Sequence, residues 1–288
     1  KIRHTIGFSA DQQRQNDFDQ LHDVPKSTTD LVTLVRGFVR APLLRGLNAP
    51  QRAARKARVI AIGSAGSYTG CTMLSMNLAM ELSILEKSTL LIEGNYRAPS
   101  IAAYLAMRNI NSDSEWKSIA PHLSLAEIDQ EHAGTVDEFM DRAAEVFEFI
   151  IIDLGSISGL SNRLIDRRWT STMTTWCCDQ ADELMIVSRA DQLGGHRLSQ
   201  VADLLQHTSV RASLSFVLNM KSPGKRGESE EAKFLSSTTA LKPIRVRSIS
   251  KDSRAIVAAE DEHATLVEIN VRSSVRKSIA DLARELKS

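Results

Sequence analysis

Short runs of apolar residues alternate with longer amphipathic stretches along most of this chain, from about residue 58 to its end. Runs of this length predict β-strands, and the stretches between them have the apolar spacing of helices. Because the runs are almost continuously apolar, they favour a mainly parallel sheet that helices cover on both faces. The pattern therefore predicts a doubly wound α/β domain. The predicted strands are Val59–Ile62, Thr89–Ile92, Leu123–Ala126, Phe149–Leu154, Leu184–Ser188, Ser215–Asn219 and Ile244–Ile249.

Residues 1–57 follow a different pattern, and we predict that they form a tail and a basic linker before the domain of residues 58–288. The first 26 residues are polar without an apolar period, which is typical of a disordered tail. Residues 27–30 then predict a helix cap before the apolar stretch 31–39. The seven basic residues from position 31 to 58 could contact anionic lipid or an acidic partner, although we favour a solvated linker.

The first predicted strand of the domain leads into a glycine-rich stretch, Gly63-Ser-Ala-Gly-Ser-Tyr-Thr-Gly-Cys-Thr72, and a predicted helix over residues 72–81. This is the layout of a phosphate-binding loop, in which backbone N–H groups and a helix N-terminus surround phosphate. The loop lacks its usual lysine, because Cys71 stands before the threonine. A neutral thiol cannot supply the charge that lysine places against phosphate, although Thr72 keeps a hydroxyl for Mg²⁺. The ring of Tyr68 could also obstruct the approach of phosphate.

Polar residues end several of the other predicted strands. Glu93, Asp153 and Asn219 each follow an apolar run, as Gly63 does. Because parallel strands end at the same edge of a sheet, where ligands bind in such folds, we expect these residues to lie together. Glu93 could approach a cation there or be a solvated carboxylate at a strand end.

Composition sets limits on the function. The chain has 288 residues with 36 basic and 35 acidic side chains, so its net charge gives no reason to expect nucleic acid. Its three cysteines, two of them adjacent, do not suggest a disulfide framework and predict a reducing, cytoplasmic setting. The seven histidines show no metal-binding spacing. The uncharged stretch 59–80 is rich in glycine and polar residues, and therefore predicts a loop and helix instead of a membrane span.

Taken together, the motifs after residue 58 resemble those of the ParA/MinD group of deviant P-loop ATPases, whose loop reads Lys-Gly-Gly-x-Gly-Lys-Thr. On that consensus, Gly66 takes the place of the first signature lysine and Cys71 that of the second. Residues 90–100 resemble the family's Leu-Leu-Ile-Asp-x-Asp-x-Arg-x-Pro-Ser, with Asn95 in place of the aspartate that orients the attacking water. An amide cannot act as a carboxylate base. We therefore expect little or no hydrolysis and name no catalytic residue.

The resemblance also implies a site for ATP or ADP with Mg²⁺, although whether nucleotide binds here stays open. Asp153 matches the family aspartate that holds the magnesium shell, and Asn219 is placed like the asparagine that hydrogen-bonds the base. The expected metal ligands are Thr72 and Asp153. The expected nucleotide-binding residues are Gly66, Gly70, Cys71, Thr72 and Asn219.

Two regions resemble the CpaE/TadZ branch of this group, which is associated with tight-adherence (Flp-type) pilus systems. Residues 167–198 are similar to its arginine-rich helix, strand and Asp-x-x-Gly-x-x-Arg-Leu turn, and residues 250–282 follow its closing pattern. The branch implies a homodimeric scaffold for a pilus or secretion machine, placed in the cytoplasm or peripherally at the inner face of the membrane. Branch members often carry a receiver-like domain in front, and 57 residues are too few for one.

Two alternatives remain open: an active ATPase with an atypical loop, and a ParA-like protein that binds DNA nonspecifically, for partitioning. The basic face for DNA would comprise Arg245, Arg247, Arg272 and Arg276. Trp169 and Trp176 would share one face of a helix and could anchor a partner, although we favour burial in the core.

The last predicted helix carries an aliphatic stripe. MinD proteins end in a membrane-binding helix, so contact with a membrane is one hypothesis for it. The lack of an aromatic anchor favours docking of the stripe onto the domain itself. The stripe comprises Val271, Val275, Ile279, Leu282 and Leu286.

Overall fold

The chain divides into two compact units, Lys1–Ala53 and Ala54–Ser288. In the first unit, β1 (Ile6–Phe8) and β2 (Gln20–His22) pair as parallel strands, where the sequence pattern predicts an unstructured tail. Strands of three residues are too short to give an apolar period, which explains why they were missed. The predicted helical stretch 31–39 lies outside the described residues. The computed structural model describes residues 6–8, 20–22, 56–108, 110, 115–128, 130, 133–160, 164, 168–208 and 210–288.

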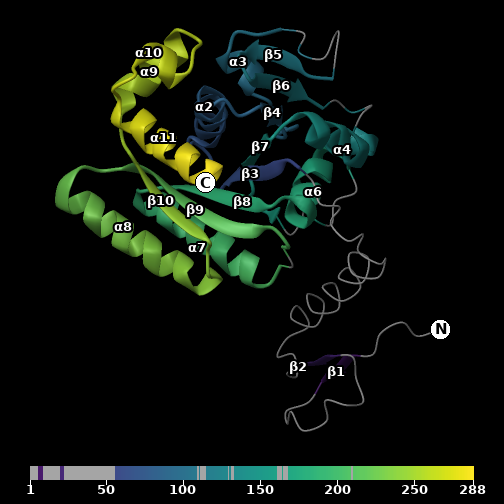
Figure 1. Cartoon of the computed structure of the whole chain (residues 1–288). Helices are drawn as coiled ribbons and strands as arrows, with labels where there is room; N and C mark the ends of the chain where they lie inside the picture. Colours follow the sequence, from purple (N-terminus) through teal and green to yellow (C-terminus); the bar gives the residue numbers. More distant parts are fainter. Residues whose placement is uncertain are drawn as a thin grey trace. The chain divides into compact units, whose positions relative to one another are not determined.

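The second unit is built on one eight-stranded sheet. Its strands are β3 (Arg58–Ser64), β4 (Thr89–Glu93), β5 (Lys117–Ala120), β6 (Leu123–Glu127), β7 (Phe149–Ser156), β8 (Glu183–Arg189), β9 (Ser213–Lys221) and β10 (Arg245–Ser250). They lie in the order β10-β9-β8-β3-β7-β4-β6-β5 (Figure 1). All neighbours pair in parallel except the edge strand β5, which is antiparallel to β6. The doubly wound fold and all seven predicted strands are confirmed, whereas β5 was missed because it is short and partly exposed.

Helices cover both faces of this sheet. One face carries α2 (Cys71–Ile84), α9 (Ser253–Asp261), α10 (Leu266–Ile269) and α11 (Ser274–Lys287), with the short α3 (Ile101–Tyr104) beside them. The other carries α4 (Val136–Val146), α6 (Thr172–Gln180), α7 (Gln192–Gln206) and α8 (Gly224–Thr238). Short 3-10 turns lie at Ala133–Thr135, Trp169–Ser171 and Thr239–Leu241.

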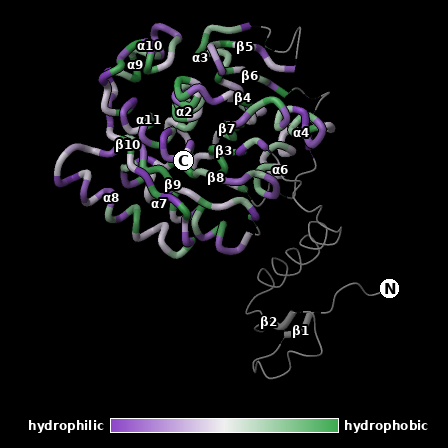
Figure 2. The backbone as a smooth tube through the Cα atoms, viewed as in Figure 1, coloured by the Kyte–Doolittle hydropathy of each residue, from purple (hydrophilic) through white to green (hydrophobic). Residues whose placement is uncertain are grey.

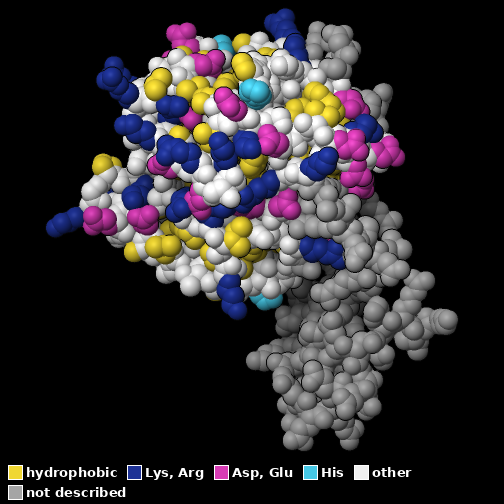
Figure 3. All heavy atoms as spheres, in the orientation of Figure 1, with side chains coloured by type: hydrophobic (Ala, Val, Ile, Leu, Met, Phe, Trp, Pro, Cys, Tyr) yellow, Lys and Arg dark blue, Asp and Glu magenta, His cyan; other side chains and the backbone are white. Residues whose placement is uncertain are grey.

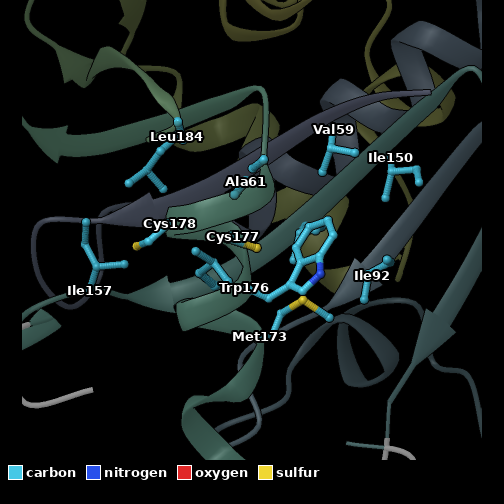
Figure 4. Packing of buried hydrophobic residues seen from close by; sticks show 14 of the residues in the cluster. Val59, Ala61, Ile92, Ile150, Ile157, Met173, Trp176, Cys177, Cys178 and Leu184 are labelled. Atoms are coloured by element: carbon cyan, nitrogen blue, oxygen red, sulfur yellow. The ribbon is translucent and has the colours of Figure 1, made fainter. Parts of the chain in front are cut away.

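Successive side chains of the strands alternate between two cores. In β3, Val59 and Ala61 belong to the core under α6, and Ile60 belongs to the core under α2. Figure 4 shows Val59 and Ala61 beside Trp176 and Cys177 of α6. The sheet is therefore buried on both sides, as its continuous apolar runs predict.

Helix α2 is mostly apolar, as its colour in Figure 2 shows, and it is buried almost all round, including its polar residues Asn77 and Glu81. It lies between the sheet and α11, which also contacts β10. Four stripe residues of α11, from Val275 to Leu286, are at most 4% exposed, so the stripe docks onto the domain as we favoured. Val271 was wrongly included, because it precedes the helix and is 58% exposed. No helix in the described part of the chain is long and apolar enough to cross a membrane.

The two tryptophans do not share a helix face. Trp169 lies in a 3-10 turn and stacks on Tyr96, with the ring centroids 5.2 Å apart. Trp176 lies in α6, is 7% exposed and donates a 2.8 Å hydrogen bond to Asp137. Trp176 is therefore a core residue, as we favoured, and the two tryptophans do not form the shared face that the alternative of a partner anchor requires.

Candidate nucleotide site

The glycine-rich loop connects β3 to α2 at the carboxyl edge of the sheet. Gly70 ends the loop in the left-handed region, at φ 79°, and a Cβ there would lie 2.5 Å from Nδ2 of Asn219. Both facts require glycine at this position. Tyr68 also has a positive φ of 57°, and its side chain is 87% exposed. Tyr68 is therefore largely exposed, and it is one of the residues that line the candidate cavity described below.

Asn219, near the end of β9, holds the loop from the side. Its Nδ2 donates to the Thr69 carbonyl at 2.7 Å, and its Oδ1 accepts the Met220 N–H at 2.8 Å. The amide thus braces the glycine-rich loop, and Asn219 also lines a cavity beside it.

Cys71, which the resemblance places at a lysine position, is 6% exposed and makes its contacts inside the domain. Its thiol donates to Asp153 Oδ1 at 3.2 Å and lies 3.4 Å from the Ile62 carbonyl. Burial, followed by the charge of Asp153, raises the pKa of this thiol well above its ordinary value. Cys71 is therefore a neutral hydrogen-bond donor and brings no positive charge to the loop.

Asp153, in β7, is fully buried. Its Oδ1 accepts the Gly155 N–H at 3.0 Å, while its Oδ2 has no hydrogen-bond partner in the described structure. Burial raises the pKa of the carboxyl, against the opposing effects of Thr72, Gly155 and Cys71. A buried carboxylate oxygen without a partner beside a threonine hydroxyl fits Mg²⁺, which needs only one or two protein ligands when water and phosphate complete its shell.

Glu93, which ends β4, lies beside Asp153 in the sheet register. It is 2% exposed, so the expectation of a solvated carboxylate is wrong. The turn after β4 folds back over it, and its carboxylate accepts the N–H groups of Asn95, Ser100 and Ile101 at 3.1, 2.7 and 3.0 Å. Burial and the charge of Asp153 raise the pKa of Glu93 to about 7. Glu93 therefore organises the loop that follows it.

Asn95 belongs to this loop. Its amide donates to the Ala98 carbonyl at 2.9 Å and packs on Gly155, where a Cβ would lie 2.4 Å from Asn95 Nδ2. Further along the loop, the Ser100 hydroxyl lies 3.3 Å from that of Thr72. Sequence reasoning missed the roles of Glu93 and Ser100, since both depend on how the turn folds back.

A cavity of about 670 Å³ lies between the glycine-rich loop, Asn219 and the loop that carries Asn95 and Ser100. All five predicted nucleotide-binding residues line it, and Asp153 lies behind Cys71. Arg97 and Lys251 contribute basic side chains, and Met73 and Ile256 are among its apolar residues. The cavity thus combines a polar loop with an apolar wall, as a site for a small phosphorylated ligand requires.

Comparison with solved structures identifies the fold. MinD from Pyrococcus horikoshii, in complex with Mg-ADP, is 18% identical with a TM-score of 0.61, and the match covers 81% of this chain and 96% of that one. The fold is that of the ParA and MinD ATPases. A McdA–ATP complex from Cyanothece shares the ParA/MinD fold at 16% identity and a TM-score of 0.59, over 81% and 96% of the two chains. The MinC:MinD complex from Aquifex aeolicus matches at 20% and 0.56, over 80% and 96%. No protein-family model and no curated protein matches the sequence.

The basic residues that were candidates for DNA contact are mostly ion-paired in this ParA/MinD fold. Arg245 pairs with Glu183 and Glu285, and Arg247 pairs with Glu285. Arg276 pairs with Glu81. On the face shown in Figure 3, basic and acidic side chains are intermixed. The predicted basic face is thus largely neutralised, which argues against the DNA-binding alternative.

Proposed function

We propose that this chain is a ParA/MinD-type protein that binds a nucleotide with Mg²⁺ but hydrolyses it slowly or not at all, and acts as a scaffold. One observation carries the proposal: at the lysine position, Cys71 is a buried neutral thiol hydrogen-bonded to Asp153. In this proposal, the backbone of the glycine-rich loop and the start of α2 hold phosphate, whereas the loop lacks the lysine charge that assists phosphoryl transfer.

Nucleotide binding is supported by the cavity and by the metal-binding potential of Asp153. Backbone N–H groups at the start of α2 do not depend on the identity of residue 71, so they can still donate to a bound anion. The unpartnered oxygen of Asp153 gives Mg²⁺ an anchor, and Thr72 gives it a hydroxyl. The solved MinD with Mg-ADP and McdA with ATP support the same ligand class for this chain.

Slow hydrolysis is supported by Asn95. Its amide bonds to the Ala98 carbonyl, and an amide cannot take a proton from an attacking water. Glu93 does not replace the missing aspartate, because its oxygens accept three backbone N–H groups.

The biological setting rests on the resemblance to the CpaE/TadZ branch over residues 167–198 and 250–282. We propose a homodimer that helps to assemble a tight-adherence pilus machine at the inner face of the cell membrane. A solved MinC:MinD complex supports partner recruitment by this fold. Neighbouring genes for pilin, a secretion ATPase and a membrane platform protein would support this setting, and a partition locus would contradict it.

Calorimetric titration with ATP and ADP, with and without Mg²⁺, tests the biochemical part when phosphate release is followed in the same sample. We expect binding that Mg²⁺ strengthens, without steady phosphate release. Asp153→Asn should remove the Mg²⁺ dependence, whereas Asp281→Asn should not, because the side chain of Asp281 is 67% exposed and pairs with Arg284 on the same helix.

Two other outcomes would decide against the proposal. Steady phosphate release that Asp153→Asn abolishes would establish an active ATPase with an atypical loop. A lack of binding to either nucleotide would leave a scaffold that works without nucleotide.

A further inference from the structure

The start of α7 carries the sequence Asp191-Gln-Leu-Gly-Gly-His-Arg-Leu198, and the structure gives its main residues separate tasks. Asp191 Oδ1 accepts the Gly194 N–H at 2.8 Å and so caps the helix. A Cβ at Gly194 would lie 2.3 Å from the Arg189 carbonyl oxygen, so only glycine lets α7 start against the end of β8. Leu198 is 1% exposed and fixes the first turns to the core. These contacts hold the position of Arg197.

Arg197 lies against the phosphate loop. The position that a Cβ of Gly66 would take is 2.5 Å from Arg197 Cδ and 2.7 Å from its Nη1. The arginine therefore fills the space in which a side chain at residue 66 would begin. Residue 66 is where the first signature lysine would stand, so an arginine from α7 occupies the place that this lysine leaves.

The surroundings of Arg197 favour an anion. It lines a second cavity of about 410 Å³ together with Ala65, Gly66, Ser67 and Gln200. Gly66 and Ser67 also line the cavity of about 670 Å³, so the two cavities meet at the loop segment that Arg197 contacts. No carboxylate among the described residues forms an ion pair with Arg197.

The proposed nucleotide site also needs a positive charge. A nucleoside triphosphate brings several negative charges to a loop that has no lysine at positions 66 and 71, beside the buried carboxyls of Glu93 and Asp153. A guanidinium is always charged and presents donors in a planar fork that matches phosphate oxygens.

We propose that Arg197 is the phosphate-binding cation of this site and contacts the terminal phosphate of a nucleoside triphosphate on the loop. This inference rests on the proposed nucleotide binding. The chain has thus exchanged a lysine on the loop for an arginine on α7, and glycine at residue 66 is the condition for that exchange.

Titration of wild type, Arg197→Ala and Arg197→Lys with ATP, ADP and AMP tests the inference. We expect Arg197→Ala to weaken ATP binding by about tenfold or more, since it removes a charge-assisted hydrogen bond, and to leave AMP binding nearly unchanged. Arg197→Lys should recover part of the loss. Arg272→Ala, which removes the same charge at an exposed position, should match wild type.

A second variant covers the case in which Arg197→Ala fails to fold. Gly66→Ala leaves Arg197 in the chain, but its methyl group meets the flexible arginine side chain and displaces it. We expect the same selective loss of ATP affinity, with an unchanged melting temperature.

Different results separate the two proposals. If wild type binds ATP, and Arg197→Ala and Gly66→Ala bind ATP as tightly as wild type does, the role of Arg197 is overturned and the nucleotide-binding proposal stands. Equal losses for ATP, ADP and AMP would overturn it too, because they would indicate a purely structural role. If wild type binds no nucleotide, both proposals are overturned.

Discussion

The thiol of Cys71 lies between the Ile62 carbonyl and the Asp153 carboxylate, 3.4 and 3.2 Å from their oxygens. The loop before α2 is held by the left-handed Gly70, by the start of α2 and by the hydrogen bond from Asn219 to the Thr69 carbonyl. The conformation of this loop is thus set by residues other than Cys71, whose side chain bonds to Asp153.

Burial should make all three cysteines unreactive in the folded protein. Cys71, Cys177 and Cys178 are buried, and burial raises the pKa of each thiol, to about 12 for Cys178. With Ellman's reagent at pH 8, we expect less than one fast-reacting thiol per folded chain and three after denaturation. One thiol that reacts within seconds in the native protein would contradict the burial of that cysteine.

Glu93 should make the stability depend on pH. Its pKa rises from 4.5 to about 7 on folding, so between these values the folded state binds more protons than the unfolded state. Stability should therefore fall as the pH increases from about 4.5 to above 7, by about 3 kcal/mol for this group alone.

Urea unfolding at pH 5 and pH 8 measures this effect. Wild type should lose more stability between the two pH values than Glu93→Gln, whatever the absolute stability of the variant. Equal losses would show that the carboxyl of Glu93 is not the group responsible.

Among the elements, the central strands could be predicted because burial on both faces produces continuous apolar runs, such as Phe149–Leu154. The partly exposed strand β5 has no such run. The residues at the strand ends could be predicted as neighbours because parallel strands end together. The N–H groups that Glu93 accepts could not, since they come from a turn whose path no local pattern specifies. Arg197 was also missed, because its contact with Gly66 joins residues far apart in the chain.

Two adjacent glycines in α7 should respond oppositely to substitution. Gly194→Ala places a methyl group 2.3 Å from a backbone carbonyl oxygen, whereas at Gly195 nothing lies within 4 Å of the added Cβ. We expect Gly194→Ala to lower the free energy of unfolding by about 2 kcal/mol, because backbone must shift. Gly195→Ala should raise it by up to about 1 kcal/mol through helix propensity. Thermal unfolding of both variants checks this, and equal melting temperatures would contradict the close packing of α7 on β8.

At the scale of the whole domain, α11 ties the end of the chain to its first strand and helix. Arg58 of β3 donates a 2.6 Å hydrogen bond to the Leu286 carbonyl. Arg276 of α11 donates to Glu81 of α2 at 2.6 Å, and Glu81 is 5% exposed. The last helix is therefore part of the cooperative core.

Removal of Arg276 should destabilise the whole domain. Arg276→Ala leaves the Glu81 carboxylate buried without its partner, and we expect a loss of roughly 2–3 kcal/mol. Arg284→Ala, on the same helix, breaks an exposed pair and should cost less than about 0.5 kcal/mol. Urea unfolding measures the free energy of unfolding of the two variants. Similar values would show that the Arg276–Glu81 pair does not stabilise the domain.

The stack of Trp169 on Tyr96 has an optical consequence. Tyr96 lies in the loop that carries Asn95 and Ser100, whereas Trp176 is in the core and Trp116 packs on Phe139 and Phe147. Of the three tryptophans, Trp169 alone is attached to a wall of the site. A ligand that moves this loop changes the surroundings of one indole and leaves the other two as they were. The chain thus carries a built-in fluorescent reporter of its own site.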